Sequence, residues 1–141
     1  AMQKHLYLLL LLTVITACKS SIQEGEISRL EGYWEITKVV FQDGTTKPYT
    51  VNTTVDYIGI DGFNGYIKKM KPGLNGRYQT SNKAAQFKLI QKDGLWEMHF
   101  EGDQKSTLSL LELDSLEYAV KDQGQVRYYY KRYEPININD E

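Results

Sequence analysis

Apolar and polar residues alternate along most of the chain, from residue 30 to residue 133, with the period of two that is typical of half-buried β-strands. Asp-Gly pairs interrupt this alternation at residues 43–44, 61–62 and 93–94, and residues 122–125 form a similar polar break. Asp-Gly is among the strongest hairpin signals, because glycine readily adopts the positive φ angle that a tight turn needs. The pattern therefore predicts successive strands that pair antiparallel.

The predicted strands cover residues 32–41, 55–61, 64–71, 76–81, 85–92, 95–101, 106–114, 117–122 and 126–133. From residue 30 onward no segment shows a 3.6-residue period, so the predicted fold class is all-β, an antiparallel up-and-down meander. A flat sheet of such strands would leave two exposed edges, and closure into a small β-barrel of 8–9 strands removes them. A sandwich is the alternative, but it needs longer connections than these turns supply.

Side-chain parity assigns one face of each predicted strand to the interior, because successive side chains of a strand point to opposite faces. Lys38 shares the parity of Trp34, so either Lys38 enters the interior or a β-bulge shifts the strand after Ile36. The other residues that parity sends inward are Ile58, Ile60, Tyr78, Phe87, Leu89, Trp96, Met98, Phe100, Tyr118, Val120, Tyr128 and Tyr130.

The amino terminus has the pattern of an export signal. Lys4 and His5 precede an apolar run at residues 6–15, which is too short for the roughly 20 residues of a membrane-spanning helix. Residues 15–18, Ile-Thr-Ala-Cys, resemble a bacterial lipobox, which implies cleavage before Cys18 and acylation of that residue. Several acyl chains, at about 0.8 kcal/mol per buried CH₂, would hold the protein on a membrane. The alternative is an ordinary secretory signal that leaves Cys18 as a free thiol.

These features divide the chain into four predicted segments. Residues 1–17 form a lipoprotein signal peptide, in which Ala1 before Met2 reads as a cloning remnant, and residues 18–29 form a lipid-anchored flexible tether. Residues 30–134 form the barrel domain, and residues 135–141 form a polar tail. Lys19 after the cysteine favours sorting to the outer membrane of a bacterial cell envelope, with the periplasmic or surface face left open.

Composition and charge narrow the classes of partner. The chain has 141 residues, of which 25% are charged and 41% hydrophobic, as in one globular domain. Its formal charge of −1 offers no global basic field for nucleic acid. Lys68, Lys69, Lys71 and Arg77 form a local basic cluster that could touch anionic headgroups or an acidic partner, but a solvated turn is the favoured interpretation. Cys18 is the single cysteine, so we expect no disulfide.

Gly32-Tyr33-Trp34 at the start of the first strand and VRYYYKRY at residues 126–133 resemble the lipocalin-like domains of bacterial lipoproteins of the Bacteroidetes type, within the calycin group. The resemblance spans residues 30–133. It implies that Trp34, next to Gly32, plugs one barrel end and that an arginine of the last strand lies across it, Arg132 first and Arg127 second. A guanidinium over an indole gains about 0.5–2 kcal/mol. The start of the strand is also similar to that of heat-shock META-type barrels, which stay as an alternative.

The sequence contains few residues suited to catalysis. Glu97, His99 and Glu101 share one strand face and could offer ligands to zinc, but the opposite face is apolar, so we interpret them as the outer polar face. With His5 removed in the signal segment, His99 is the one histidine left, so we expect neither a His-based triad nor a multi-His site. We therefore predict that the protein is not an enzyme and needs no metal or cofactor.

The resulting functional prediction is a membrane-anchored, lipocalin-like barrel that binds a small apolar or amphipathic ligand in its interior. The competing prediction is a structural or accessory envelope lipoprotein with a filled core, which acts through protein–protein contacts. Inward aromatic and sulfur-containing side chains are the expected ligand contacts: Tyr78, Phe87, Trp96, Met98, Tyr118, Tyr128 and Tyr130.

Overall fold

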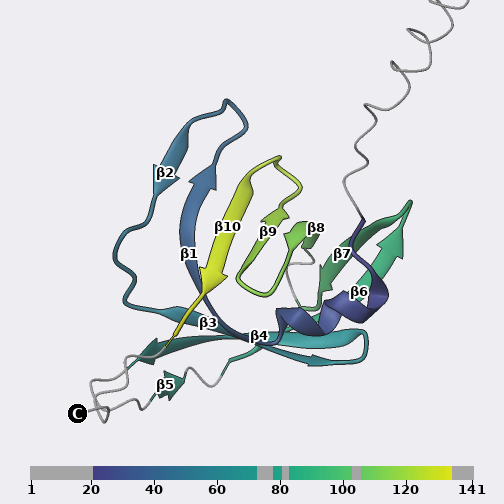
Figure 1. Ribbon diagram of the computed structural model, residues 1–141, viewed down its shortest axis with the longest axis horizontal. Helices are drawn as coiled ribbons and strands as arrows, with labels where there is room; N and C mark the ends of the chain where they lie inside the picture. The colour runs from purple at the N-terminus through teal and green to yellow at the C-terminus, as the bar shows by residue number, and fades with distance from the viewer. Residues whose placement is uncertain (1–20, 73–77, 81–82, 103–105, 135–141) are drawn as a thin grey trace, which may run out of the picture.

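The computed structural model describes residues 21–72, 78–80, 83–102 and 106–134 (Figure 1). It begins with a 3-10 helix, η2 (Glu24–Leu30), and continues entirely in strands. The strands are β1 (Gly32–Val40), β2 (Thr46–Pro48), β3 (Val55–Asp61), β4 (Asn64–Pro72), β5 (Tyr78–Thr80), β6 (Ala85–Lys92), β7 (Leu95–Phe100), β8 (Thr107–Leu113), β9 (Glu117–Lys121) and β10 (Arg127–Arg132).

Eight of these strands form a closed antiparallel barrel in the order β1-β3-β4-β6-β7-β8-β9-β10, and β10 pairs with β1 to complete the ring. β2 pairs with β1 and β5 pairs with β4, both outside the ring. Neighbours in the ring are also neighbours along the chain, apart from the short β2 and β5, as hairpin connections require. The predicted all-β meander closed into a barrel is confirmed, and the pairing of β10 with β1 rules out a sandwich.

The strand bounds follow the predicted ranges closely, and two elements were missed. β3 and β6 agree with the prediction at both ends. β2 was not predicted, since it is only three residues long and includes Pro48. η2 was not predicted either: residues 24–29 were assigned to the flexible tether, and this is wrong because Ile27 and Leu30 are buried in the core. The packed domain therefore begins at least six residues before residue 30.

A bulge in β1 resolves the position of Lys38. The register of β1 against β10 shifts between Ile36 and Lys38, so Lys38 lies opposite Tyr129 on the outer face, with its ammonium 4.6 Å from the ring centroid. Val39 consequently faces inward opposite Tyr128 and is 5% exposed. Of the two alternatives for this strand, the bulge is confirmed.

The barrel core is filled on the side of η2, β6, β7 and β8. η2 contacts β3 and β8, and the Trp96 indole N–H donates to the Ile22 carbonyl at 3.0 Å. A Cβ added at Gly65 would lie 2.3 Å from the Phe87 ring, so this glycine lets the ring pass close to the β4 backbone. The buried cluster comprises Ile27, Leu30, Trp34, Ile58, Phe87, Leu89, Trp96, Met98, Leu110, Leu113, Tyr118 and Val120.

Most residues that parity sent inward belong to this cluster or pack against it. Ile60, Phe100, Tyr128 and Tyr130 are partly buried at its margin. Leu110 and Leu113 were missed because a bulge between Leu110 and Glu112 changes the parity of β8.

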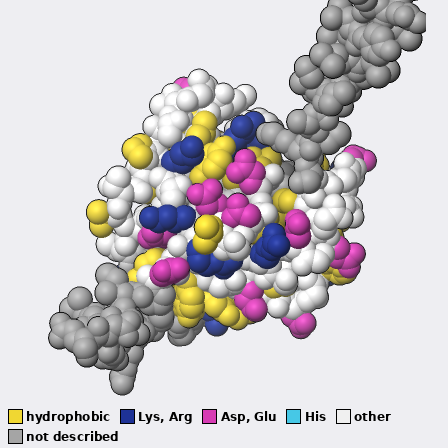
Figure 2. Space-filling view, in the orientation of Figure 1, with side chains coloured by type: hydrophobic (Ala, Val, Ile, Leu, Met, Phe, Trp, Pro, Cys, Tyr) yellow, Lys and Arg dark blue, Asp and Glu magenta, His cyan; other side chains and the backbone are white. Residues whose placement is uncertain are grey.

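No described helix is long and apolar enough to cross a membrane. On the face seen in Figure 2, basic and acidic side chains are interspersed rather than segregated, as expected from the small net charge.

Candidate ligand cavity

Trp34 and Arg132 close one end of the barrel. The Trp34 side chain is fully buried, and its indole N–H donates to the Leu30 carbonyl at 2.8 Å. The guanidinium carbon of Arg132 lies 3.8 Å from the indole centroid. The same guanidinium donates hydrogen bonds to the carbonyls of Glu31 at 2.7 Å, Arg29 at 2.8 Å and Ser115 at 3.2 Å, so it fastens η2 and the β8–β9 turn to the end of β10.

Gly32 is required at this end for two reasons. Its φ angle is +128°, which L side chains rarely adopt, and an added Cβ would lie 2.5 Å from Arg132 Nη1. Partial burial lowers the pKa of the Arg132 guanidinium from its ordinary value. Arg127, the second arginine considered for this role, lies at the opposite end of β10, where it pairs with Val40. Arg132 is therefore the arginine that lies on the tryptophan.

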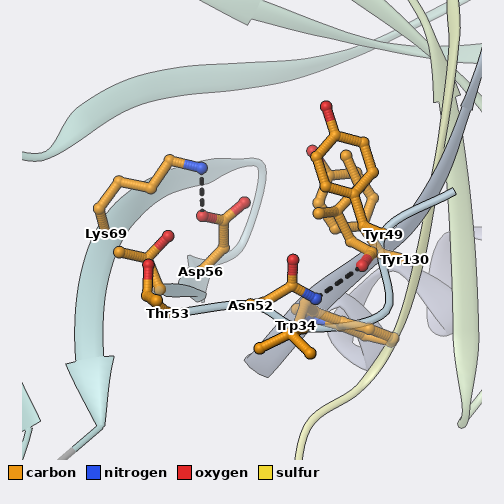
Figure 3. Close-up of a pocket in the computed structure, with 10 residues that line it drawn as sticks. Trp34, Tyr49, Asn52, Thr53, Asp56, Lys69 and Tyr130 are labelled. Carbon is orange, nitrogen blue, oxygen red and sulfur yellow. Dashed lines mark hydrogen bonds and ion pairs between the residues drawn. The ribbon is translucent and has the colours of Figure 1, made fainter. Parts of the chain in front are cut away.

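A cavity of about 310 Å³ occupies the barrel on the other side of Trp34 (Figure 3). It exists because β1 pairs with β3 only over Gly32, Tyr33 and Trp34, whereas the second half of β1 pairs with β2. The barrel wall is therefore completed there by residues 49–54 instead of a strand pair. The lining residues are Trp34, Ile36, Tyr49, Val51, Asn52, Thr53, Thr54, Asp56, Lys69 and Tyr130.

Two hydrogen bonds fix the segment at residues 49–54 to β1. The Tyr49 backbone N–H donates to the Thr37 carbonyl at 2.8 Å, and the Asn52 side-chain amide donates to the Ile36 carbonyl at 2.9 Å. The first bond continues the β1–β2 register by one residue beyond Lys38 and Pro48, and the second uses a β1 carbonyl beyond the end of the β1–β3 pairing. Val51, at the outer rim, is 85% exposed. The segment thus forms a polar wall that only a few contacts hold in place.

The cavity contains one buried charge. Asp56 is 6% exposed and points inward from β3, on the same parity as Ile58. Its Oδ1 accepts a hydrogen bond from Lys69 Nζ at 2.5 Å, across the β3–β4 pair, and the Lys69 side chain is 66% exposed. The aspartate is therefore part of the wall, and the lysine forms the rim.

Aromatic rings form the apolar floor of the cavity. Tyr118 packs edge-on to Trp34 at a centroid distance of 4.7 Å and stacks on Tyr130 at 4.6 Å. Burial raises the pKa of Tyr130 well above its ordinary value, and the negative charge of Asp56 raises it further. Burial likewise raises the pKa of Tyr118, with smaller contributions from Tyr130 and Asp56. Both phenols consequently remain protonated in the folded protein at neutral pH.

The structure separates the residues that we expected to contact a ligand. Of the described members of that set, Tyr130 lines the cavity, whereas Phe87, Trp96, Met98 and Tyr118 are packed in the core. Tyr128 is held by a 3.0 Å hydrogen bond from its hydroxyl to Asp122. The side chain of Tyr78 and all of Cys18 lie outside the described residues. Most of the expected contacts lie in the filled part of the barrel. Bulky inward side chains pack against one another there instead of lining a cavity.

Sequence reasoning missed most of the cavity wall. Parity could have identified Asp56, because Asp56 has the same parity as Ile58 and Ile60, which lie on the inward face of β3. Lys69 was grouped with the solvated basic turn, although it pairs opposite Asp56 in the register of β3 and β4. Residues 52–54 lie between two predicted strands, 32–41 and 55–61. No local signal placed them against the barrel, because that contact depends on where β1 separates from β3.

Two other features of the sequence fall outside this cavity. His99 Nε2 lies 3.4 Å from Glu97 on the outer face of β7, whereas Glu101 is paired with Lys88 at 3.9 Å. Among the described residues, no group of three or more His, Cys, Asp or Glu side chains is arranged to hold a metal ion. In the basic cluster, Lys68 lies 5.4 Å from the Tyr66 ring centroid, and Arg77 lies outside the described residues.

No protein-family model matches the chain, and no curated protein matches it by sequence. Among solved structures, the chain is similar to a lipocalin-like protein from Bacteroides uniformis, with a TM-score of 0.47 and 11% identity, over 74% of this chain and 99% of that one. It is also similar to lobster apocrustacyanin A1, with a TM-score of 0.48 and 15% identity, over 84% of this chain and 67% of that one. Apocrustacyanin C1 has a TM-score of 0.49 and 14% identity, with the same coverage.

Because these TM-scores are low, the assignment of the fold depends on the strand pairing of this chain. A closed, eight-stranded, antiparallel up-and-down barrel fits the lipocalin or calycin fold. The Gly32-Tyr33-Trp34 start of β1 and the arginine at the end of β10 have the positions that the resemblance implied.

Proposed function

We propose that this protein is a lipid-anchored, lipocalin-like binding protein of the bacterial cell envelope, whose barrel cavity takes a small amphipathic molecule. The cavity beside Trp34 carries this proposal. Its volume of about 310 Å³ lies at the lower end of the range of ligand pockets, about 300–1,000 Å³. A largely apolar floor with a few polar groups at the rim is the composition that such pockets share.

The lining divides in a way that suits an amphipathic ligand. Trp34, Ile36 and Tyr130 form the apolar part, and Asp56, Lys69 and the amide and hydroxyl side chains of residues 52–54 form the polar part. Figure 3 shows the aromatic side chains on one side of the cavity and the Asp56–Lys69 pair on the other. An apolar tail would lie against the rings, and a polar end would lie near the pair.

Uptake of an alkyl probe tests this proposal. Native mass spectrometry of the purified chain should detect a co-purifying ligand or a bound probe such as decanol. Ile36→Trp would fill the cavity and should abolish uptake, whereas Ile90→Trp, at an outward position that is 42% exposed, should leave uptake unchanged. Equal uptake by Ile36→Trp and the unaltered chain would place the ligand elsewhere and contradict the proposal.

The lipid anchor is supported by residues 15–18 of the sequence, which resemble a lipobox. In this proposal Cys18 carries the acyl chains, and the outer membrane is the destination. Cys18→Ser should move the protein from the membrane fraction to the soluble fraction and remove the acyl mass from the amino-terminal peptide. An unmodified Cys18 thiol in the membrane-bound protein would contradict the anchor.

The filled half of the barrel favours one second candidate, an accessory envelope protein that acts through its surface. Large apolar side chains remain exposed outside the cavity, including Leu95 at 59% and Leu116 at 64%. In that case the purified chain would bind no decanol and would instead form a defined complex with an envelope protein, which Leu95→Ser or Leu116→Ser would weaken. The uptake experiment therefore separates the two candidates.

A further inference from the structure

Asp56 is the most unusual residue of the cavity because it is a carboxylate in a mostly apolar barrel. Its side chain is 8% exposed, and it lies beside Trp34 in the β1–β3 register. An ionised carboxylate that leaves water needs partners for its oxygens, since burying an unsatisfied charge is strongly unfavourable. The partners of Asp56 therefore indicate what the cavity is built to hold.

Those partners are incomplete. Lys69 donates to Oδ1, and within the described part of the chain no hydrogen-bond donor reaches Oδ2. Figure 3 shows the carboxylate between Lys69 and the aromatic side chains, with its second oxygen pointing away from the lysine. The Lys69 side chain is 66% exposed, so it can move into solvent, whereas Asp56 cannot leave the wall. One acceptor in the cavity is thus permanent, and its present donor is replaceable.

The aromatic residues across the cavity favour a positively charged ligand, as the Asp56 carboxylate does. Trp34, Tyr49 and Tyr130 line it together, and aromatic faces attract cations through their negative quadrupole. Tyr49 already lies 5.1 Å from the Lys47 ammonium, measured to the ring centroid. The negative charge of Asp56 reaches this region as well, because it contributes to the raised pKa of Tyr130. A cationic group in the cavity would meet both a carboxylate and electron-rich rings.

We propose that the cavity selects amphipathic ligands whose polar end is an ammonium group, which binds at Asp56 and displaces the Lys69 ammonium into solvent. This proposal rests on the proposed function, since it names the charge of the ligand in the same cavity. The alternative is an anionic headgroup held by Lys69 and Lys47. A bound anion would lie next to the buried Asp56 charge, whereas the exposed lysine is solvated and screened.

Three probes of equal chain length test the charge of the polar end: decylammonium, decanol and decanoate, each below its micelle concentration. Calorimetric titration of the full chain should show decylammonium binding tighter than decanoate by about tenfold or more, which corresponds to one charge-assisted hydrogen bond. Asp56→Asn should weaken decylammonium binding by about tenfold and change decanol binding by less than about twofold. Asp61→Asn removes the same charge from the exposed end of β3 and should change neither.

Lys69→Gln provides an independent readout, because it removes the internal competitor without altering Asp56. It should strengthen decylammonium binding by a few-fold and, because it leaves the buried Asp56 carboxylate without its charged donor, lower the thermal stability of the ligand-free chain. Equal affinity of all three probes, or tighter binding of decanoate that Lys69→Gln abolishes, would overturn the ammonium proposal while leaving the binding function intact. Failure of every probe, decanol included, would overturn the binding function itself. If Asp56→Asn unfolds the chain, Lys69→Gln and the three-probe comparison decide the result.

Discussion

The two sides of the Trp34 indole differ in how their polar groups are satisfied. At the sealed end, the indole N–H and three guanidinium N–H groups of Arg132 each reach a backbone carbonyl. On the cavity side, Oδ2 of Asp56 and the Tyr130 hydroxyl have no hydrogen-bond partner within the described residues. The same barrel thus contains an end built for stability and a side that leaves polar groups available. The difference arises where β1 leaves β3.

Truncating the indole should have the largest effect, because Trp34 serves both sides. We expect Trp34→Ala to lower the free energy of unfolding by about 3–5 kcal/mol, as for other large-to-small core substitutions. Urea denaturation followed by circular dichroism measures the loss. His99→Ala, on the outer face of β7, should change stability by less than about 0.5 kcal/mol. Comparable losses from both variants would mean that the inner and outer faces are misassigned.

Replacing the guanidinium tests the sealed end alone. Arg132→Met keeps an apolar side chain over the indole but removes the cation–π contact and three hydrogen bonds, at a cost of about 1–3 kcal/mol. Arg127→Met is the matched control at the other end of β10 and should cost less than about 0.5 kcal/mol. Binding of decanol should survive Arg132→Met in the folded protein, since the cavity lies on the other side of Trp34.

Alkaline pH tests two buried tyrosines, Tyr118 in the core and Tyr130 on the cavity floor. The pKa values of Tyr118 and Tyr130 are raised in the folded state, so above about pH 10 the unfolded chain releases protons that the folded chain retains. Stability is therefore fully present below that pH and falls above it, by up to about 1.4 kcal/mol per pH unit for each tyrosine. Urea melts between pH 8 and about 11 measure the slope.

Tyr130→Phe should make stability fall less steeply above about pH 10, because it removes one of the buried phenols whose pKa is raised. Tyr129→Phe, which removes a hydroxyl from the outer face beside Lys38, is the matched control. An identical slope in the unaltered chain and in Tyr130→Phe would show that the Tyr130 phenol is solvated, which contradicts its position on the cavity floor.

The smallest effect on stability is expected for the segment that closes the cavity. Asn52→Ala removes the hydrogen bond to the Ile36 carbonyl, which should cost about 0.5–1.5 kcal/mol. The same change should weaken probe binding more than it weakens folding, because it releases residues 49–54 from β1. Thr50→Ala, at an exposed position of the same segment that does not line the cavity, serves as the control in both measurements. Unchanged probe binding in Asn52→Ala would mean that this segment does not form the wall of the site.

Much of the barrel was predictable because its determinants are local. Asp-Gly pairs and alternation predicted β3 and β6 at both ends, since each hairpin is specified by residues that are neighbours in the sequence. The bulge after Ile36 was one of two alternatives that a lysine at an inward position implied. β2 and η2 were missed because a three-residue strand and a short 3-10 helix carry too little periodicity to detect.

The sequence by itself determined an antiparallel meander, its inward parity and the pairing of a tryptophan with an arginine from the last strand. Each of these follows from side-chain alternation and turn chemistry, which act over a few residues, or from a resemblance carried by a short motif. Only the tertiary structure decided which inward residues pack and which line the cavity. That choice depends on the point at which β1 exchanges β3 for β2 as its partner, and on residues 49–54 folding back against it. Such contacts join distant segments, so no local pattern contains them.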